Sequence, residues 1–227
     1  MPVQETMALM PPVGVATWSP RDLPGQRILV SLRAANLAFL ELLGGPGSTG
    51  IAAVCGVPPP YAQRFAARPE ASQAVAAALP FTLFDLRFRD EPFWRSAVTG
   101  TAAVQDATAA PGAHPAALSF ARVALVFAWH AVDVCAPSAA LALGAPDGVL
   151  RLVGDLPLAS IEPLSHRLAP ALAARFAERE LFWQRLTDCL REPDPRQLER
   201  VCLLGLQLHG TDSARGRLLQ RRARREP

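Results

Sequence analysis

The chain has 227 residues, half of them hydrophobic and 19% charged, and its formal net charge is +3 at pH 7. This composition excludes a disordered or collagen-like protein and is typical of a globular one. The length fits one large domain or two small ones.

Positive charge gathers at the C-terminal end. Residues 212–227 hold six arginines against Asp212 and Glu226, a net charge of +4, which leaves −1 for the preceding chain. This asymmetry favours an acidic partner such as nucleic acid. The alternative is a solvated, flexible end without a partner. The chain contains no lysine, which we attribute to the base composition of the genome and not to phosphate recognition.

In chain order, residues 1–25 contain five prolines and no sustained period, so they predict a flexible leader. Residues 27–43 carry apolar side chains near helical spacing and precede Gly44 and Gly45, which predicts a helix with a glycine stop. A short helix follows, capped by Ser48 or Thr49, and ends at Gly56 and Pro58.

Short helices are then expected over 61–67 and 70–78. Phe81, Phe84 and Phe88 follow at spacings of three and four, which places them on one face of a helix. The alternation in this segment also fits a strand. We predict a helix, because the matching segment 170–182 is rich in the strong helix formers Ala, Leu, Arg and Glu.

Residues 100–116 are rich in Ala, Thr, Gly and Pro and predict a linker. Beyond it the same order of elements recurs, with helices expected over 118–134, 138–143, 147–153, 158–168 and 169–189 and a break at Ala136 and Pro137. An additional helix over 194–208 is expected to be capped by Asp194, with Pro195 in its first turn, and to end at Gly210.

The two halves match one another at a nearly constant offset. An offset of 88 aligns Gly56 with Gly144 and Pro58 with Pro146, and an offset of 89 aligns the Phe-Trp pair at 93–94 with that at 182–183. A repeated segment is a repeated folding unit. We therefore predict an all-α fold of two helical repeats, related by a pseudo-two-fold axis and packed as an intramolecular dimer. The expected organisation is a flexible leader at 1–25, repeat 1 at 26–99, a linker at 100–116, repeat 2 at 117–190, and a C-terminal helix with an Arg-rich tail at 191–227.

No catalytic or metal-binding motif stands out. The four histidines are scattered, and the four cysteines include no C-x-x-C pair, so a zinc site is not expected. The glycine-rich segment 44–50 lacks the lysine of a phosphate-binding loop and follows a helix, so it predicts a turn. We expect no enzymatic activity, no cofactor and no metal. A deep pocket joining His130 or His166 to a carboxylate would reverse this expectation.

The most apolar segment, 116–134, is interrupted by Arg122, His130 and Asp133, which favours a buried helix over a membrane span. The scattered cysteines indicate a reducing compartment. We therefore expect a cytoplasmic protein without membrane contact.

One segment of each half resembles a known family. The run 138–144, Ser-Ala-Ala-Leu-Ala-Leu-Gly, a short helix ending at Leu156 and the pair Arg175-Phe176 are similar to the flagellar transcriptional regulator FlhD, and the first half carries its own version over 51–56, 68–78 and 83–88. The resemblance covers about 60 residues of each half and implies an all-helical protein that works as a homodimer with FlhC. A tandem duplication would then fuse that dimer into one chain.

The resemblance implies a non-enzymatic transcriptional regulator, an activator in flagellar gene control, which acts on double-stranded DNA with an FlhC-like partner subunit. Arginines of the last helix and tail are the candidate phosphate contacts: Arg191, Arg196, Arg200, Arg215, Arg217, Arg221 and Arg222. The recurring aromatic pairs are the candidate interface between the repeats: Phe93, Trp94, Phe182 and Trp183. The alternative function is a helical adaptor or chaperone-like module without DNA binding, which would expose an apolar patch near Phe81, Phe84 and Phe88.

Overall fold

A computed structural model describes residues 24–45, 49–67, 70–100, 114–191 and 194–223, with the side chains of the last helix described as far as Asp212. Within these ranges the chain is mostly helical, and the strands are two of two residues each. The elements of the N-terminal half are α1 (Pro24–Gly44), α2 (Thr49–Val54), α3 (Pro59–Ala66), α4 (Glu70–Ala76), β1 (Phe84–Asp85) and α5 (Glu91–Thr99). Those that follow are α7 (Pro115–Leu143), α8 (Asp147–Gly154), η3 (Leu158–Ser160), α9 (Ile161–Leu168), η4 (Ala169–Ala171), β2 (Ala173–Ala174), α10 (Glu180–Cys189) and α11 (Pro195–Ala223).

Local signals account for several helix boundaries. The Asp90 carboxylate accepts a hydrogen bond from the Phe93 amide at 2.9 Å, and Asp194 does the same for the Arg196 amide. Both are N-caps followed by a proline in the first turn. Helix α7 ends at Gly144, whose φ of +71° suits glycine better than any residue with a Cβ. Inside α7, Cys135 is extended (φ −164°, ψ 97°), two residues before Pro137, which confirms the predicted break.

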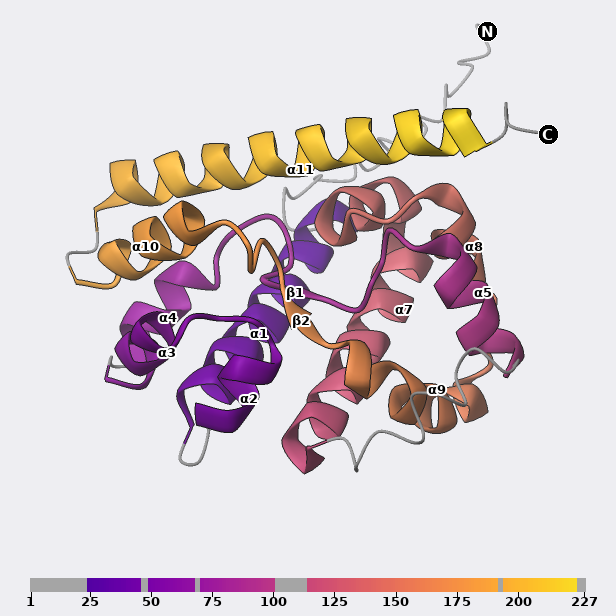
Figure 1. Cartoon of the computed structure of the whole chain (residues 1–227), viewed down its shortest axis with the longest axis horizontal. Coiled ribbons are helices and arrows are strands. Elements are labelled where there is room, and N and C mark those ends of the chain that lie inside the picture. The colour runs from indigo at the N-terminus through magenta and orange to yellow at the C-terminus, as the bar shows by residue number, and fades with distance from the viewer. Residues whose placement is uncertain (1–23, 46–48, 68–69, 101–113, 192–193, 224–227) are drawn as a thin grey trace, which may run out of the picture.

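The core is built around the long helices α1 and α7, which pack against each other at the centre of the molecule (Figure 1). Among the described residues, α7 is the one helix long and apolar enough to cross a membrane. The core helices of soluble proteins can have the same length and composition. Here Ala121, Ala124, Leu125 and Ala128 of α7 are fully buried, so this face of α7 belongs to the protein core.

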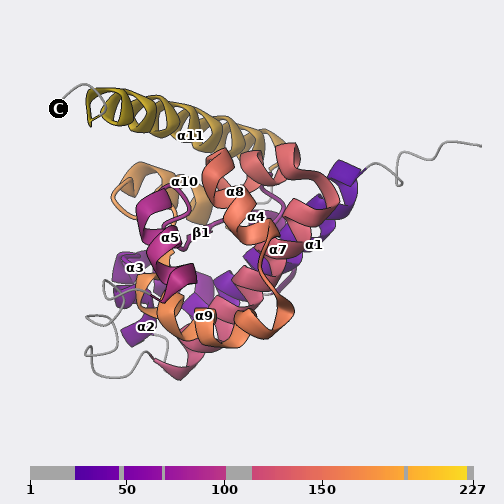
Figure 2. The same ribbon diagram turned by 90° about the vertical axis from the view of Figure 1, so that its right-hand side faces the viewer.

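The last helix of each half packs on elements of the other half. Helix α5 contacts α8 and α9, whereas α10 contacts α3, so the two ends of the molecule each combine both halves (Figure 1). Between them β1 and β2 pair antiparallel, Phe84 opposite Ala174 and Asp85 opposite Ala173. Helix α11 lies along the outside of the body, against α10 (Figure 2).

One predicted helix is wrong and another is wrong in its first half. Residues 81–88 form β1 and turns, and in the helix predicted over 169–189 residues 169–179 form η4, β2 and a turn, whereas Glu180–Cys189 is helical as α10. The reason is that the amides of this region bond to distant acceptors: Thr82 to the Ala142 carbonyl, Leu83 to the Asn36 side chain, and Arg175 to the Leu83 carbonyl. A helix would need those amides for its own ladder.

The predicted end of the last helix is also wrong, because α11 continues through Gly210 to Ala223. A glycine costs a helix about 1 kcal/mol relative to alanine, so Gly210 weakens α11 without ending it.

Candidate functional site

Arg175 is the buried polar centre of the molecule. Its side chain is 5% exposed, and Nη1 donates to the Thr82 hydroxyl at 2.7 Å and to the Ala142 carbonyl at 2.9 Å. Nη2 lies 2.7 Å from Nδ1 of His209 on α11. Arg175 therefore joins three parts of the chain: the segment before β1, the end of α7, and α11.

Gly144 makes room for this guanidinium. A Cβ at that position would lie 2.1 Å from Nη2 of Arg175 and 2.7 Å from the His209 ring. Burial lowers the pKa of Arg175 to about 10, with Asp85 and Asp212 acting in the opposite direction. The group stays charged at neutral pH, although no carboxylate of the described residues is within ion-pair distance of it.

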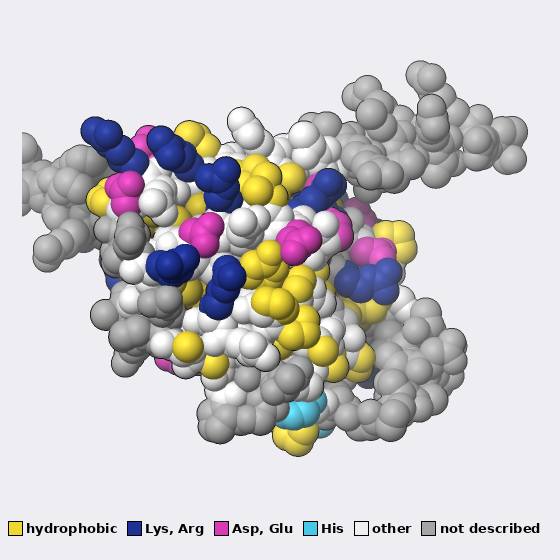
Figure 3. All heavy atoms as spheres, turned by 60° about the vertical axis from the view of Figure 1, so that its left-hand side comes forward, with side chains coloured by type: hydrophobic (Ala, Val, Ile, Leu, Met, Phe, Trp, Pro, Cys, Tyr) yellow, Lys and Arg dark blue, Asp and Glu magenta, His cyan; other side chains and the backbone are white. Residues whose placement is uncertain are grey.

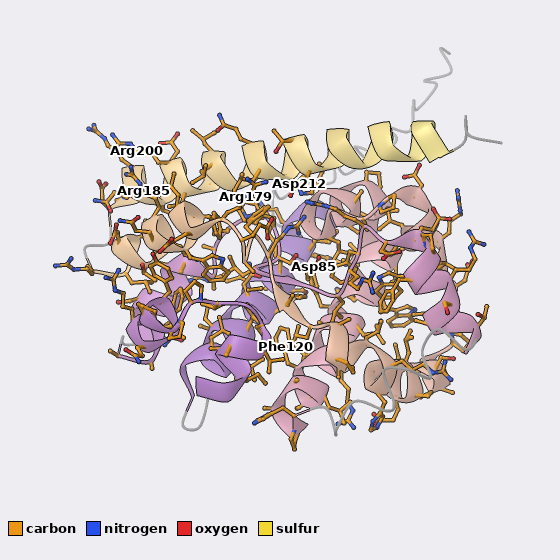
Figure 4. All side chains as sticks on the ribbon, viewed as in Figure 1. Asp85, Phe120, Arg179, Arg185, Arg200 and Asp212 are labelled. Atoms are coloured by element: carbon orange, nitrogen blue, oxygen red, sulfur yellow. The ribbon has the colours of Figure 1, made fainter. Side chains whose placement is uncertain are left out.

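His209 is held in its neutral form. A guanidinium can only donate, so Nδ1 of His209 must accept and the ring proton resides on Nε2. Burial, followed by the charges of Arg175 and Arg89, lowers the pKa of His209 to about 4, and Asp212 opposes this shift. One turn further along α11, Asp212 accepts from Arg89 at 2.7 Å and lies 3.9 Å from Arg179 (Figure 4). These contacts fasten the middle of α11 to the body.

Acid is expected to weaken this attachment. Because the folded-state pKa of about 4 lies below the unfolded value near 6.5, only the unfolded state takes up this proton between those values. The contribution of His209 is therefore complete above pH 6.5 and is lost as the pH falls towards 4. We expect a loss of about 1 to 2 kcal/mol between pH 7 and pH 5, allowing for partial solvent screening of the ring. Urea unfolding at both pH values measures it.

His209→Gln is the matched control, because its amide oxygen can accept from Arg175 without titrating. The variant is expected to lose less stability than the parent chain between pH 7 and pH 5. Equal losses in the two proteins would contradict the assignment of the effect to His209.

Part of the predicted basic surface lies at the α10–α11 corner. Arg191, Arg196 and Arg200 are exposed there. Arg200 shares a groove with Arg185 of α10, which was not among the predicted residues (Figure 4). Acidic residues alternate with these arginines: Asp188 lines the same groove, and Glu199 precedes Arg200. Arginine and acidic side chains are interspersed on this side of the molecule (Figure 3). The side chains of the other four predicted contacts, Arg215, Arg217, Arg221 and Arg222, lie outside the described residues.

The aromatic pairs are buried to different degrees. The Trp183 ring meets Phe65 edge-on at 6.0 Å, and the Phe182 ring lies 6.2 Å from Phe81, so both contact residues of the first half. Trp94 is fully buried and stacks on Phe88 at 5.6 Å, within its own half. Phe93 is half-buried beneath the Arg87 guanidinium, 4.4 Å from its ring centre.

The histidines named in the sequence analysis do not form a buried catalytic pair. Nε2 of His166 lies 3.2 Å from the Glu162 carboxylate on the surface, where Arg122 also binds Glu162. His130 lines an apolar groove of about 490 Å³ between α1 and α7, in which no carboxylate takes part. Among the described residues no cluster of His, Cys, Asp and Glu could hold a metal ion.

Comparison with protein-family models, with curated proteins and with solved structures finds no match.

Sequence reasoning missed Arg175 as a structural centre and Arg185 as a neighbour of Arg200. A local signal existed for Arg175, since it is the one charged residue in the otherwise apolar run 169–176. An unpaired charge in such a run predicts burial with hydrogen-bonding partners. Nothing local marks Arg185, because its proximity to Arg200 depends on how α10 packs against α11.

Proposed function

We propose that the chain is a fused dimer of FlhD-like helical units, a non-enzymatic transcriptional regulator that binds a partner subunit and DNA through its surface. The proposal has two parts, the fused dimer and the DNA contact, and they rest on different observations.

The spacing of equivalent elements supports the fused dimer. Helix α3 (Pro59–Ala66) and helix α8 (Asp147–Gly154) are 88 residues apart at both ends. The two strands are 89 residues apart, as are the starts of α5 and α10. Residues with positive φ recur in the same way, with Gly56 and Gly144 88 apart and Arg87 and Phe176 89 apart. An unusual backbone conformation recurring at the offset of the sequence repeat is expected of one unit that occurs twice.

The pairing of β1 with its counterpart β2 is the observation that carries this part of the proposal. At the offset of 89, Phe84 corresponds to Ala173 and Asp85 to Ala174. The observed pairs are Phe84 with Ala174 and Asp85 with Ala173. Phe84 thus pairs with the residue equivalent to Asp85, and Asp85 pairs with the residue equivalent to Phe84. Antiparallel pairing of a segment with its own counterpart puts a local two-fold axis between the two strands, as expected at an isologous interface.

The α10–α11 corner supports the DNA contact. Its arginines Arg191, Arg196 and Arg200 are exposed, as phosphate contacts must be, and α11 carries the remaining candidates towards its C-terminal end. Phosphate contacts of this kind give affinity that falls with salt and carry no sequence information.

The test is binding of a short DNA duplex as a function of salt. Replacing Arg215, Arg217, Arg221 and Arg222 by glutamine is expected to lower the slope of log K against log salt by roughly 0.9 for each phosphate contact removed. The control changes Arg33 and Arg151, which are exposed on α1 and α8. DNA affinity and slope unchanged by these four substitutions would contradict the DNA contact of the tail, and the same result for Arg191, Arg196 and Arg200 changed to glutamine would contradict that of the α10–α11 corner.

An adaptor without DNA binding is the second candidate. The mixed charge of the α10–α11 corner favours it, as do Leu203 and Leu206, which are 54% and 44% exposed on α11. The apolar patch envisaged from the sequence is not available, because Phe81, Phe84 and Phe88 are fully buried.

A further inference from the structure

A groove of about 450 Å³ runs between α10 and α11 at the corner that carries Arg200. Its lining comes from one face of each helix: Leu181, Arg185, Asp188 and Cys189 from α10, and Gln197, Arg200, Val201 and Leu204 from α11. Apart from the neighbours 188–189 and 200–201, these positions are three, four, seven or eight residues apart within each helix, so the lining follows one broad face of each helix. The groove is therefore a continuous channel between two helices and not a gap beside a loop.

The groove has an apolar floor, formed by the buried side chains of Val201 and Cys189, and an exposed apolar side chain, Leu181, at its edge. Val201 is 2% exposed and Cys189 is 1% exposed, so they belong to the protein core beneath the groove. Leu181 is 54% exposed although it lines the same groove, which leaves a large aliphatic side chain in water. Burying such a leucine is worth about 1.5 to 3 kcal/mol.

Two arginines lie on opposite sides of this floor. Arg185 belongs to α10 and Arg200 to α11, and both side chains are exposed. Within the described residues neither guanidinium takes part in an ion pair. Asp188 is the one acidic residue of the lining, so the rim carries a net positive charge. A complementary ligand presents carboxylates to both sides and apolar groups between them.

We propose that the α10–α11 groove binds an amphipathic helix of the partner protein, with its apolar stripe on Leu181, Val201 and Leu204 and its carboxylates paired with Arg185 and Arg200. This is the helix-in-groove mode of recognition, in which apolar anchors one turn apart enter a channel between two helices. The inference rests on the proposed function, because it gives the surface and the chemistry by which the partner subunit is recognised. A DNA backbone fits the groove less well, because phosphates offer nothing apolar to Leu181.

The probes are two synthetic helical peptides of about five turns with the same leucine stripe, one flanked by glutamates and the other by lysines. Fluorescence anisotropy with the full chain measures binding. The glutamate peptide is expected to bind at least ~10-fold more tightly than the lysine peptide. Equal binding of the two peptides would overturn the charge complementarity on which the inference depends.

Substitutions locate the binding site. Leu181→Asp and Arg185→Glu are each expected to weaken the glutamate peptide about 10-fold or more, which corresponds to 1.4 kcal/mol. The matched control is Leu203→Asp, since Leu203 is as exposed as Leu181, at 54%, but does not line the groove. Both leucines are on the surface, so neither change should prevent folding. Similar weakening by Leu181→Asp and Leu203→Asp would place the peptide elsewhere and refute the inference.

Arg200 belongs to both proposals, so they are separated by competition with a DNA duplex together with a substitution at a residue that belongs to the groove alone. Leu181 and Arg185 are not among the proposed phosphate contacts, so Leu181→Asp is expected to leave the salt slope of DNA binding unchanged. Displacement of the peptide by DNA, together with loss of DNA affinity in Leu181→Asp, would make the groove a nucleic-acid site and overturn the inference. Failure of DNA binding with retained peptide binding would instead remove only the DNA part of the proposed function.

Discussion

Trp183→Ala is expected to lower the free energy of unfolding by about 3 to 5 kcal/mol, the usual cost of removing a large aromatic side chain from a packed core. Trp183 is fully buried, its ring packs edge-on against Phe65 at 6.0 Å and against Phe182 at 5.7 Å, and its Nε1 donates to the Phe176 carbonyl at 3.2 Å. Removing it leaves a cavity where α10 meets the first half of the chain. Urea unfolding at neutral pH measures the loss.

Trp94 tests whether the two halves are energetically equivalent. It is also fully buried, stacks on Phe88, and donates from Nε1 to the Leu86 carbonyl at 3.1 Å. If the chain is a fused dimer, Trp94→Ala should also lower the free energy of unfolding by about 3 to 5 kcal/mol, the range expected for Trp183→Ala. Leu141→Ala, at a side chain that is 68% exposed, is the control and should change stability by less than about 0.5 kcal/mol. A small loss for one tryptophan beside a large loss for the other would argue against equivalent units.

The helices could be predicted from local signals because local interactions determine them. Apolar spacing, Asp194 as a cap and the break before Pro137 are all contained within a few neighbouring residues. Asp90 is a local signal of the same kind, but helix α5, which it caps, was not predicted. The strands could not be predicted in this way. Asn36 accepts from the Leu83 amide and donates to the Ala77 and Phe81 carbonyls, so a side chain more than forty residues away holds that segment out of a helix.

The packing of α5 and α10 on the opposite half of the chain could not be predicted from the sequence either. A repeat offset indicates that two units are alike, but the same pattern is compatible with α10 packing on its own half or on the other. The direction of packing depends on contacts such as the hydrogen bond of 3.0 Å from the Tyr61 hydroxyl to Glu180. The same holds for the candidate surface. The charge of Arg200 is evident from the sequence, but the groove that it lines with Arg185 and Leu181 depends on how α11 packs against α10.

Docking of α11 depends on a close approach at Gly205, and Gly205→Ala is expected to loosen it. A Cβ at this position would lie 2.1 Å from the Phe81 ring, which is fully buried and packed against Phe176 and Phe182, so the ring cannot move aside. We expect a loss of about 1 to 3 kcal/mol from overpacking. Hydrogen exchange should show faster exchange in α11 than in α1 and α7, since α11 can detach while the two central helices stay packed.

Gly210→Ala, the same substitution in the same helix, is expected to raise the stability of α11 instead of lowering it. Nothing lies within 4 Å of a Cβ placed at Gly210, so the methyl group meets no neighbour. Because glycine is about 1 kcal/mol less favourable than alanine inside a helix, this variant is expected to stabilise α11 by up to that amount. The pair separates helix propensity from docking, since propensity alone predicts that both substitutions stabilise. If Gly205→Ala stabilised the chain as Gly210→Ala does, α11 would not rest on Phe81, and neither the His209 contact nor the groove beside α10 would have the geometry on which the proposals depend.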